Sequence, residues 1–100
     1  MPAYLIVKSD TSKINKEHFD QWYKTEHLQE AMVKFMAISA KRGWIKNSNF
    51  HIAIYEFENI NKAQKAMESK NLKSLVKKFD QKWDCKVNRT RELIDLKQVI

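Results

Sequence analysis

The sequence predicts an α+β protein with the element order β-α-β-β-α-β, which is the ferredoxin-like plan. Two observations carry this prediction. Short apolar runs, as in strands, alternate with longer segments whose apolar residues recur every three or four positions, as in helices. The 100 residues contain one Gly and one Pro, too few for a flexible linker, so residues 1–100 are expected to form a single domain.

The first half of the chain supplies a strand, a long helix and a second strand. Residues 3–7 (Ala-Tyr-Leu-Ile-Val) form a continuous apolar run, which is typical of a strand buried on both faces. Asn15 is a good N-cap for a helix that runs to about Met36. Residues 37–46 are expected to form the second strand, and the Asn-Ser-Asn sequence at 47–49 predicts a turn after it.

The second half repeats the pattern of strand, helix and strand. Residues 50–57 give the strongest strand signal because they are rich in Ile, Phe and Tyr. Residues 59–61 are expected to cap a second helix. Its apolar face changes phase around residues 69–71, where Asn71 is predicted to cap a new helical segment. Residues 86–96 form the predicted last strand.

The first helix also changes its apolar face. Phe19, Trp22 and Tyr23 share one face, which would continue through Glu26 and His27. A second apolar stripe then lies on roughly the opposite side of an ideal helix, made of Leu28, Ala31, Met32, Phe35 and Met36. One straight helix cannot bury both stripes against one surface. We therefore expect the helix to bend, or to stop and restart, near residues 26–28.

Both faces of the predicted sheet are largely apolar, although two helices can cover only one of them. The apolar strand residues that produce this pattern are Tyr4, Ile6, Ile52, Ile54, Tyr55 and Phe57. The bare face needs a partner. We expect a homodimer in which two sheets face each other and enclose a barrel-like interior.

Composition narrows the function classes. The single Cys excludes an intrachain disulfide and a thiolate metal cluster, and it suits a reducing cytoplasm. No secretory signal pattern is seen, and no apolar run approaches the length of about 18 residues that crosses a membrane. The three His lack metal-ligand spacing, and Gly-rich phosphate loops are absent, so no metal and no cofactor are expected.

Several segments carry a resemblance to a known family: Trp22 to Leu28, Arg42, Ile54 to Phe57, Phe79 to Trp83 and Val87 to Arg91. On these segments the chain resembles the dimeric α+β barrel superfamily, specifically its EthD-like and REDY-like branch. The resemblance implies a homodimer with a pocket between sheet and helices, or inside the barrel, in each protomer. Members look like small-ligand proteins and include cofactor-free oxygenases, isomerases and cyclases.

A pocket needs a few polar groups set in apolar walls, and the sequence offers such groups. His27 and Glu26 are the candidate catalytic acid or base. The candidate ligand-binding residues are Trp22, Tyr23, Arg42, His51 and Tyr55.

Each candidate also has a structural interpretation. Trp22 and Tyr23 are alternatively core aromatics, with His27 as a hydrogen-bonded residue at the helix break. Arg42 and Arg91 are each either an anion site or half of an ion pair, because an unpaired charge facing an apolar interior is costly. His51 is open between a site residue and a structural one.

The expected ligand is small, organic and mostly apolar, with or without one anionic group. A purely structural dimer is the first alternative. RNA binding is the second, since the net charge is +7 and RNA-recognition domains share this strand order. Against RNA, Ile52 and Ile54 occupy the places where such domains put stacking aromatics.

Overall fold

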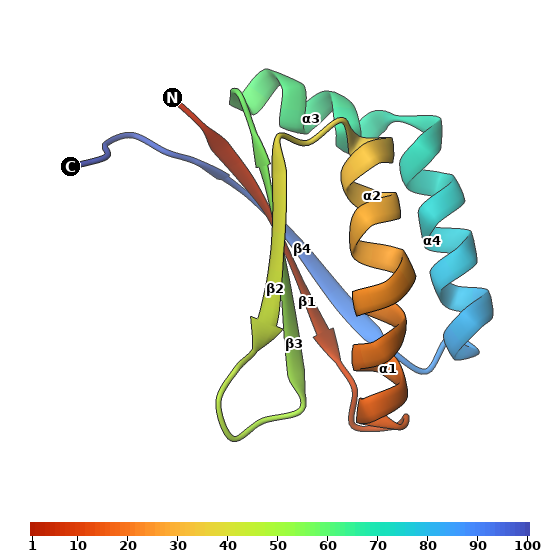
Figure 1. The fold of residues 1–100 in the computed structure, drawn as a ribbon. Coiled ribbons are helices and arrows are strands. Elements are labelled where there is room, and N and C mark those ends of the chain that lie inside the picture. The colour runs from red at the N-terminus through yellow and green to blue at the C-terminus, as the bar shows by residue number, and fades with distance from the viewer.

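A computed structural model describes all residues 1–100 and has the predicted order of elements (Figure 1). One antiparallel sheet has the strand order β2-β3-β1-β4, and all helices cover the same face of it. The elements are β1 (Ala3–Asp10), α1 (Lys16–Trp22), the π-helical turn η1 (Tyr23–His27), α2 (Leu28–Phe35), β2 (Ser39–Trp44), β3 (Phe50–Phe57), α3 (Ile60–Glu68), α4 (Lys70–Trp83) and β4 (Asn88–Asp95). The α+β, ferredoxin-like fold class is confirmed.

The first helix passes through its predicted break without stopping. The wide turn η1 joins α1 to α2, and the Leu28 N–H bonds to the Tyr23 carbonyl five residues earlier. The buried side chains of this helix are spaced four residues apart: Phe19, Tyr23, His27, Ala31 and Phe35. Each such step over-rotates an α-helix by about 40°. The π turn absorbs part of that drift and keeps His27 on the buried side.

The second helix breaks outright, but its new cap is not Asn71 as predicted. Ser69 has extended backbone angles, and its hydroxyl accepts the Leu72 N–H, so α4 begins at Lys70. The Asn71 side chain instead donates to the Lys34 carbonyl at 3.1 Å. The Asn71 side-chain amide therefore makes a tertiary hydrogen bond to α2 and does not cap α4.

Three strands differ in length from the prediction, and one of them, β4, spans Asn88–Asp95 instead of residues 86–96. β1 runs three residues further, to Asp10, because Asp10 pairs with Phe50 at the start of β3. β2 is shorter than residues 37–46, since α2 extends to Phe35 and its C-cap residue Met36 has a left-handed backbone (φ 58°). The N-caps at Asn15 and Asn59 are confirmed, because each side chain accepts a backbone N–H three residues later.

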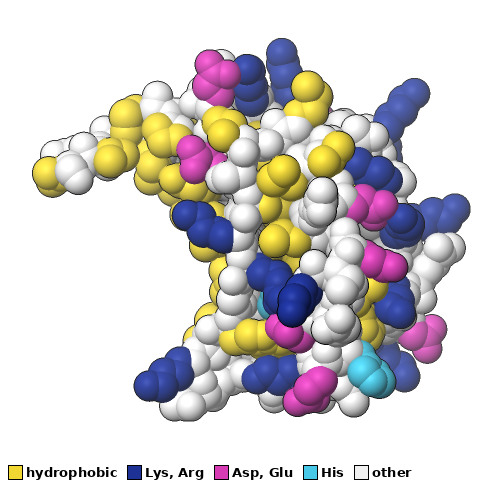
Figure 2. Space-filling model, in the orientation of Figure 1, with side chains coloured by type: hydrophobic (Ala, Val, Ile, Leu, Met, Phe, Trp, Pro, Cys, Tyr) yellow, Lys and Arg dark blue, Asp and Glu magenta, His cyan; other side chains and the backbone are white.

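The two sheet faces alternate as expected. Leu5, Val7 and Tyr55 are buried under the helices, whereas Ile6 and Ile54 lie half-buried on the opposite face, which no element covers. Figure 2 shows Lys and Arg side chains along the helical side and apolar side chains near the two chain ends. No helix is both long enough and apolar enough to span a membrane.

Candidate functional site

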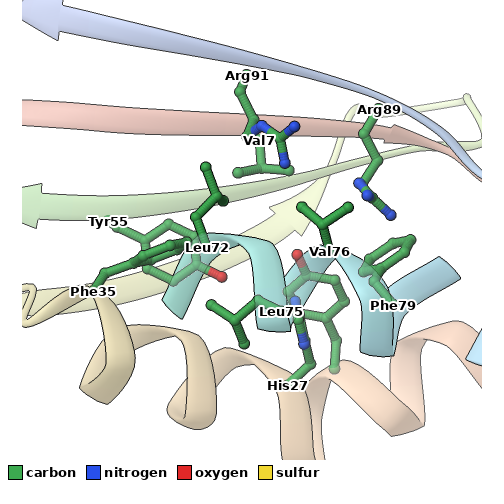
Figure 3. A pocket seen from close by; sticks show the side chains of 11 residues that line it. Val7, His27, Phe35, Tyr55, Leu72, Leu75, Val76, Phe79, Arg89 and Arg91 are labelled. Atoms are coloured by element: carbon green, nitrogen blue, oxygen red, sulfur yellow. The ribbon is translucent and has the colours of Figure 1, made fainter. Parts of the chain in front are cut away.

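A small apolar cavity lies between the sheet and the helices (Figure 3). Its volume is about 30 Å³, which is room for roughly two water molecules. The cavity is lined by Val7 of β1, Tyr23 and His27 of η1, Phe35 of α2, Tyr55 of β3, Leu72, Leu75, Val76 and Phe79 of α4, and Arg89 and Arg91 of β4. Three of the sequence candidates, Tyr23, His27 and Tyr55, therefore share one cavity.

His27 is held in the cavity wall by aromatic contacts. Its ring stacks on Trp22 at 4.4 Å and meets the edges or faces of Tyr23 at 4.8 Å and Phe79 at 5.4 Å, measured between ring centroids. Burial lowers the pKa of His27 to about 4, so the ring is neutral at neutral pH. Its Nδ1 atom is enclosed and has no hydrogen-bond partner within the chain.

Two buried tyrosines supply hydroxyl groups beside His27. Tyr23 lies between two imidazoles, 4.8 Å from His27 and 4.3 Å from His51 between ring centroids. Burial raises the pKa of Tyr23 to about 12 and that of Tyr55 well above its usual value. The neighbouring Tyr55 side chain opposes part of the increase in the pKa of Tyr23, whereas Tyr23 raises the pKa of Tyr55 further. Both hydroxyls stay protonated at neutral pH.

Two other candidate residues, Trp22 and Glu26, lie outside this cavity, in a polar groove on the helical surface. The groove has a volume of about 540 Å³ and is lined by Trp22, Glu26, His27, Glu30, Lys78 and Lys82. Glu26 is exposed there, and the Trp22 ring covers one face of His27. His27 is the one residue that lines both spaces, so its ring forms part of the wall between them.

Arg42 and His51 belong to a separate buried cluster. Arg42 Nη1 lies 2.8 Å from Asp20 Oδ1, and the same oxygen accepts the Trp44 indole N–H at 2.8 Å. These two donors lower the pKa of Asp20. His51 is fully buried, with Nε2 3.4 Å from Arg42, and burial lowers its pKa to about 4. Neither residue lines the cavity, and the ion-pair interpretation of Arg42 describes its contacts.

Arg89 is a cavity residue that the sequence does not predict, and Arg91, for which an anion site and an ion pair are both open from sequence, lies beside it. Arg89 pairs with Asp80 at 3.2 Å, and its guanidinium lies 3.7 Å from the centre of the Phe79 ring. Both arginines line the cavity, because they lie two residues apart on the inward face of β4. Two features indicate that both arginines face inward. They are two residues apart in the sequence Arg-Thr-Arg of the last strand, and Arg91 pairs with the inward-facing Val7.

Comparison with known proteins supports the fold. No family model and no curated protein matches the chain. An EthD family protein from Bacillus halodurans C-125 is similar in structure, with a TM-score of 0.75 and 19% sequence identity, over 97% of this chain and 100% of that protein. A mutant of SnoaB, a cofactor-independent oxygenase from Streptomyces nogalater, gives a TM-score of 0.68 and 9% identity, over 99% of this chain and 96% of that one. The fold implied by the resemblance to the EthD-like branch is thus confirmed.

Proposed function

We propose that this protein binds a small, mostly apolar organic ligand in the cavity between sheet and helices, with His27 as its central polar contact. One observation carries the proposal. His27, whose buried Nδ1 has no hydrogen-bond partner within the chain, lines an apolar space together with Tyr23 and Tyr55. Buried polar groups are nearly always hydrogen-bonded. An unpaired, unprotonated Nδ1 in a cavity wall suits a ligand hydroxyl, which would donate to it.

The protonation states suggest what the site can do. A neutral His27 can accept a proton or a hydrogen bond from an acidic hydroxyl or carbon acid, while Tyr23 and Tyr55 donate to developing charge on oxygen. This set suits deprotonation of a phenol-like hydroxyl or of the carbon next to a lactone carbonyl, with the proton accepted by His27. A cofactor-independent oxygenase among the structural neighbours adds support for chemistry of this kind. An oxygenase, an isomerase and a cyclase are the candidate enzyme classes.

Ligand binding requires the cavity to open. Its volume of about 30 Å³ is far below the roughly 300–1,000 Å³ of typical ligand sites. Leu72 and Val76 of α4 are half-buried and Arg91 of β4 is exposed, whereas the deeper lining is buried. These three side chains form the rim. We propose that a ligand enters between α4 and β4 by displacing them.

Ligand-induced thermal shifts, together with turnover screens of quinols and lactones, test this function. His27→Gln is expected to weaken binding of any hit at least about tenfold, or to abolish its turnover, because the cavity loses its neutral acceptor. His18→Gln is the matched control, since His18 is exposed on the same helix. Unchanged binding in His27→Gln would show that the ring only packs against Trp22.

We also propose that two protomers associate through the bare sheet face. Apolar side chains on this face stay partly exposed in the monomer: Tyr4, Ile6, Phe50, Ile52, Ile54 and Ile94. Lys41 and Glu56 lie on the same face, so an antiparallel pair of sheets can bring opposite charges together. The single exposed Cys85 suits the reducing cytoplasm, where we propose that the protein acts.

Light scattering at micromolar concentration tests the dimer. The expected mass is twice the 11.9 kDa of the chain. Ile54→Glu places a charge in the middle of the face and is expected to give monomers. Val33→Glu, on the exposed side of α2, is the control that should stay dimeric. A wild type that stays monomeric at high concentration would contradict the proposal and would favour the nucleic-acid alternative, which predicts RNA binding at 50 mM salt.

A further inference from the structure

Two arginines face the cavity from the edge strand β4. Arg89 and Arg91 are paired in register with Ser9 and Val7 of β1, which point toward the helices. Side chains two residues apart in a strand project from the same face. Figure 3 shows both guanidinium groups on the sheet side of the cavity, opposite His27.

The charges on this wall do not balance. The Arg89 guanidinium donates one hydrogen bond to Asp80, while Arg91 forms no ion pair within the chain. Two positive charges thus face one carboxylate. Burial and the nearby charge of Arg91 both lower the pKa of Arg89, against the opposing effect of Asp80. A guanidinium carries five N–H donors, most of which find no protein acceptor here.

The cavity lining combines one exposed arginine with mostly apolar, more buried side chains. Arg91 is exposed at the rim, next to the half-buried Leu72 and Val76 of α4. Phe35 and Leu75 are buried in the same lining, and so is most of the Arg89 side chain, of which 11% is exposed. A molecule that enters between α4 and β4 therefore meets the Arg91 guanidinium first and the mostly apolar lining behind it.

We propose that the cavity binds an amphiphilic monocarboxylate, with its carboxylate on Arg91 at the rim and its apolar body inside. The inference rests on the proposed function and names the ligand class for the same site. A planar guanidinium binds two carboxylate oxygens through parallel N–H groups. A single excess positive charge matches a monoanion, and the apolar depth disfavours sugars and nucleotides.

Paired probes test the head group. Titration calorimetry compares hexanoate with hexanamide, and benzoate with benzamide, at one salt concentration. In the wild type each carboxylate is expected to bind at least about tenfold more tightly than its amide. Arg91→Gln should abolish this preference, and Arg91→Lys should keep part of it, because a Lys retains the charge without the fork. Lys73→Gln removes the same charge from an exposed position on α4 and should change nothing.

The outcomes separate the two proposals. Amides that bind as tightly as carboxylates would overturn the head-group assignment while leaving the cavity as a ligand site. Binding of neither class would overturn the proposed function as well. A carboxylate preference that survives in Arg91→Gln but falls in Lys73→Gln would assign it to the basic surface and also overturn the inference. Circular dichroism checks that each variant is folded.

Discussion

Each of the two edge strands of the sheet carries an inward-facing arginine that pairs with an aspartate on a helix, but the two pairs differ in their surroundings. On β2, Arg42 pairs with Asp20 of α1, and on β4, Arg89 pairs with Asp80 of α4. The two arginine side chains are buried to a similar degree, with 16% and 11% of their surface exposed. Asp20, however, also accepts the Trp44 indole N–H, whereas Asp80 accepts only the one bond from Arg89.

The residues around each ion pair show why Arg42 and Arg89 differ in role. The Arg42 pair lies beside His51 within the aromatic cluster around Phe19, and none of it lines the cavity. Arg89 of the second pair lines the cavity, and Arg91 adds a second charge there without a second carboxylate. An inward-facing arginine is thus structural where its partners are satisfied within the protein. It is available to a ligand where positive charge exceeds negative charge.

The largest expected effect is a loss of stability at acidic pH, which arises from His51 beside the Arg42 pair and from His27 in the cavity wall. His51 contacts Arg42 and lies near Asp20, while His27 lies near Glu30, Lys78 and Arg89. Both folded pKa values are about 4, below the usual 6.5, so the unfolded chain binds more protons between pH 4 and 6.5. Stability is full above pH 6.5 and falls toward pH 4.

Between pH 7 and pH 5, this linkage should cost about 2 kcal/mol per histidine. Urea denaturation at each pH measures it. His51→Gln and His27→Gln should each remove about half of the pH dependence, and His18→Gln should remove none. A free energy of unfolding that stays flat over this range would show that the folded imidazoles take up protons as readily as those of the unfolded chain.

A smaller effect is expected from breaking the two ion pairs. Asp20→Ala leaves both Arg42 and Trp44 without an acceptor and should cost roughly 2 kcal/mol. Asp80→Ala removes one hydrogen bond and should cost about 1 kcal/mol or less, since Arg89 keeps its contact with the Phe79 ring. Chemical denaturation at pH 7 compares them. Equal losses in the two variants would contradict the difference between the edges.

The smallest effect is expected at Arg91. Because this side chain has no ion pair, Arg91→Gln should change the free energy of unfolding by less than about 0.5 kcal/mol. Removing its repulsion with Arg89 acts in the stabilising direction. The measurement is the same urea titration at pH 7. A loss above about 1 kcal/mol would mean that Arg91 holds a structural contact and is not free for a ligand.

Part of the candidate site could be predicted from sequence. Tyr23, His27 and Tyr55 meet in the cavity because helical and strand periodicity already put them on inward faces. Glu26 was grouped with His27, but it is exposed in the outer groove, since a neighbour in a helix points about 100° away. Arg42 was placed with the ligand-binding residues because no local pattern reveals that Asp20, on another element, pairs with it.

The sequence by itself determined the order of elements, the α+β class, the caps at Asn15 and Asn59 and the need to accommodate two apolar stripes in one helix. These features depend on neighbours within a few residues, where backbone geometry fixes which side chains lie together. Only the tertiary structure decided that a π turn resolves the stripes and that β4, rather than β2, lends its arginines to the cavity. Those outcomes depend on the sheet register and on carboxylates distant in the chain, which local periodicity does not encode.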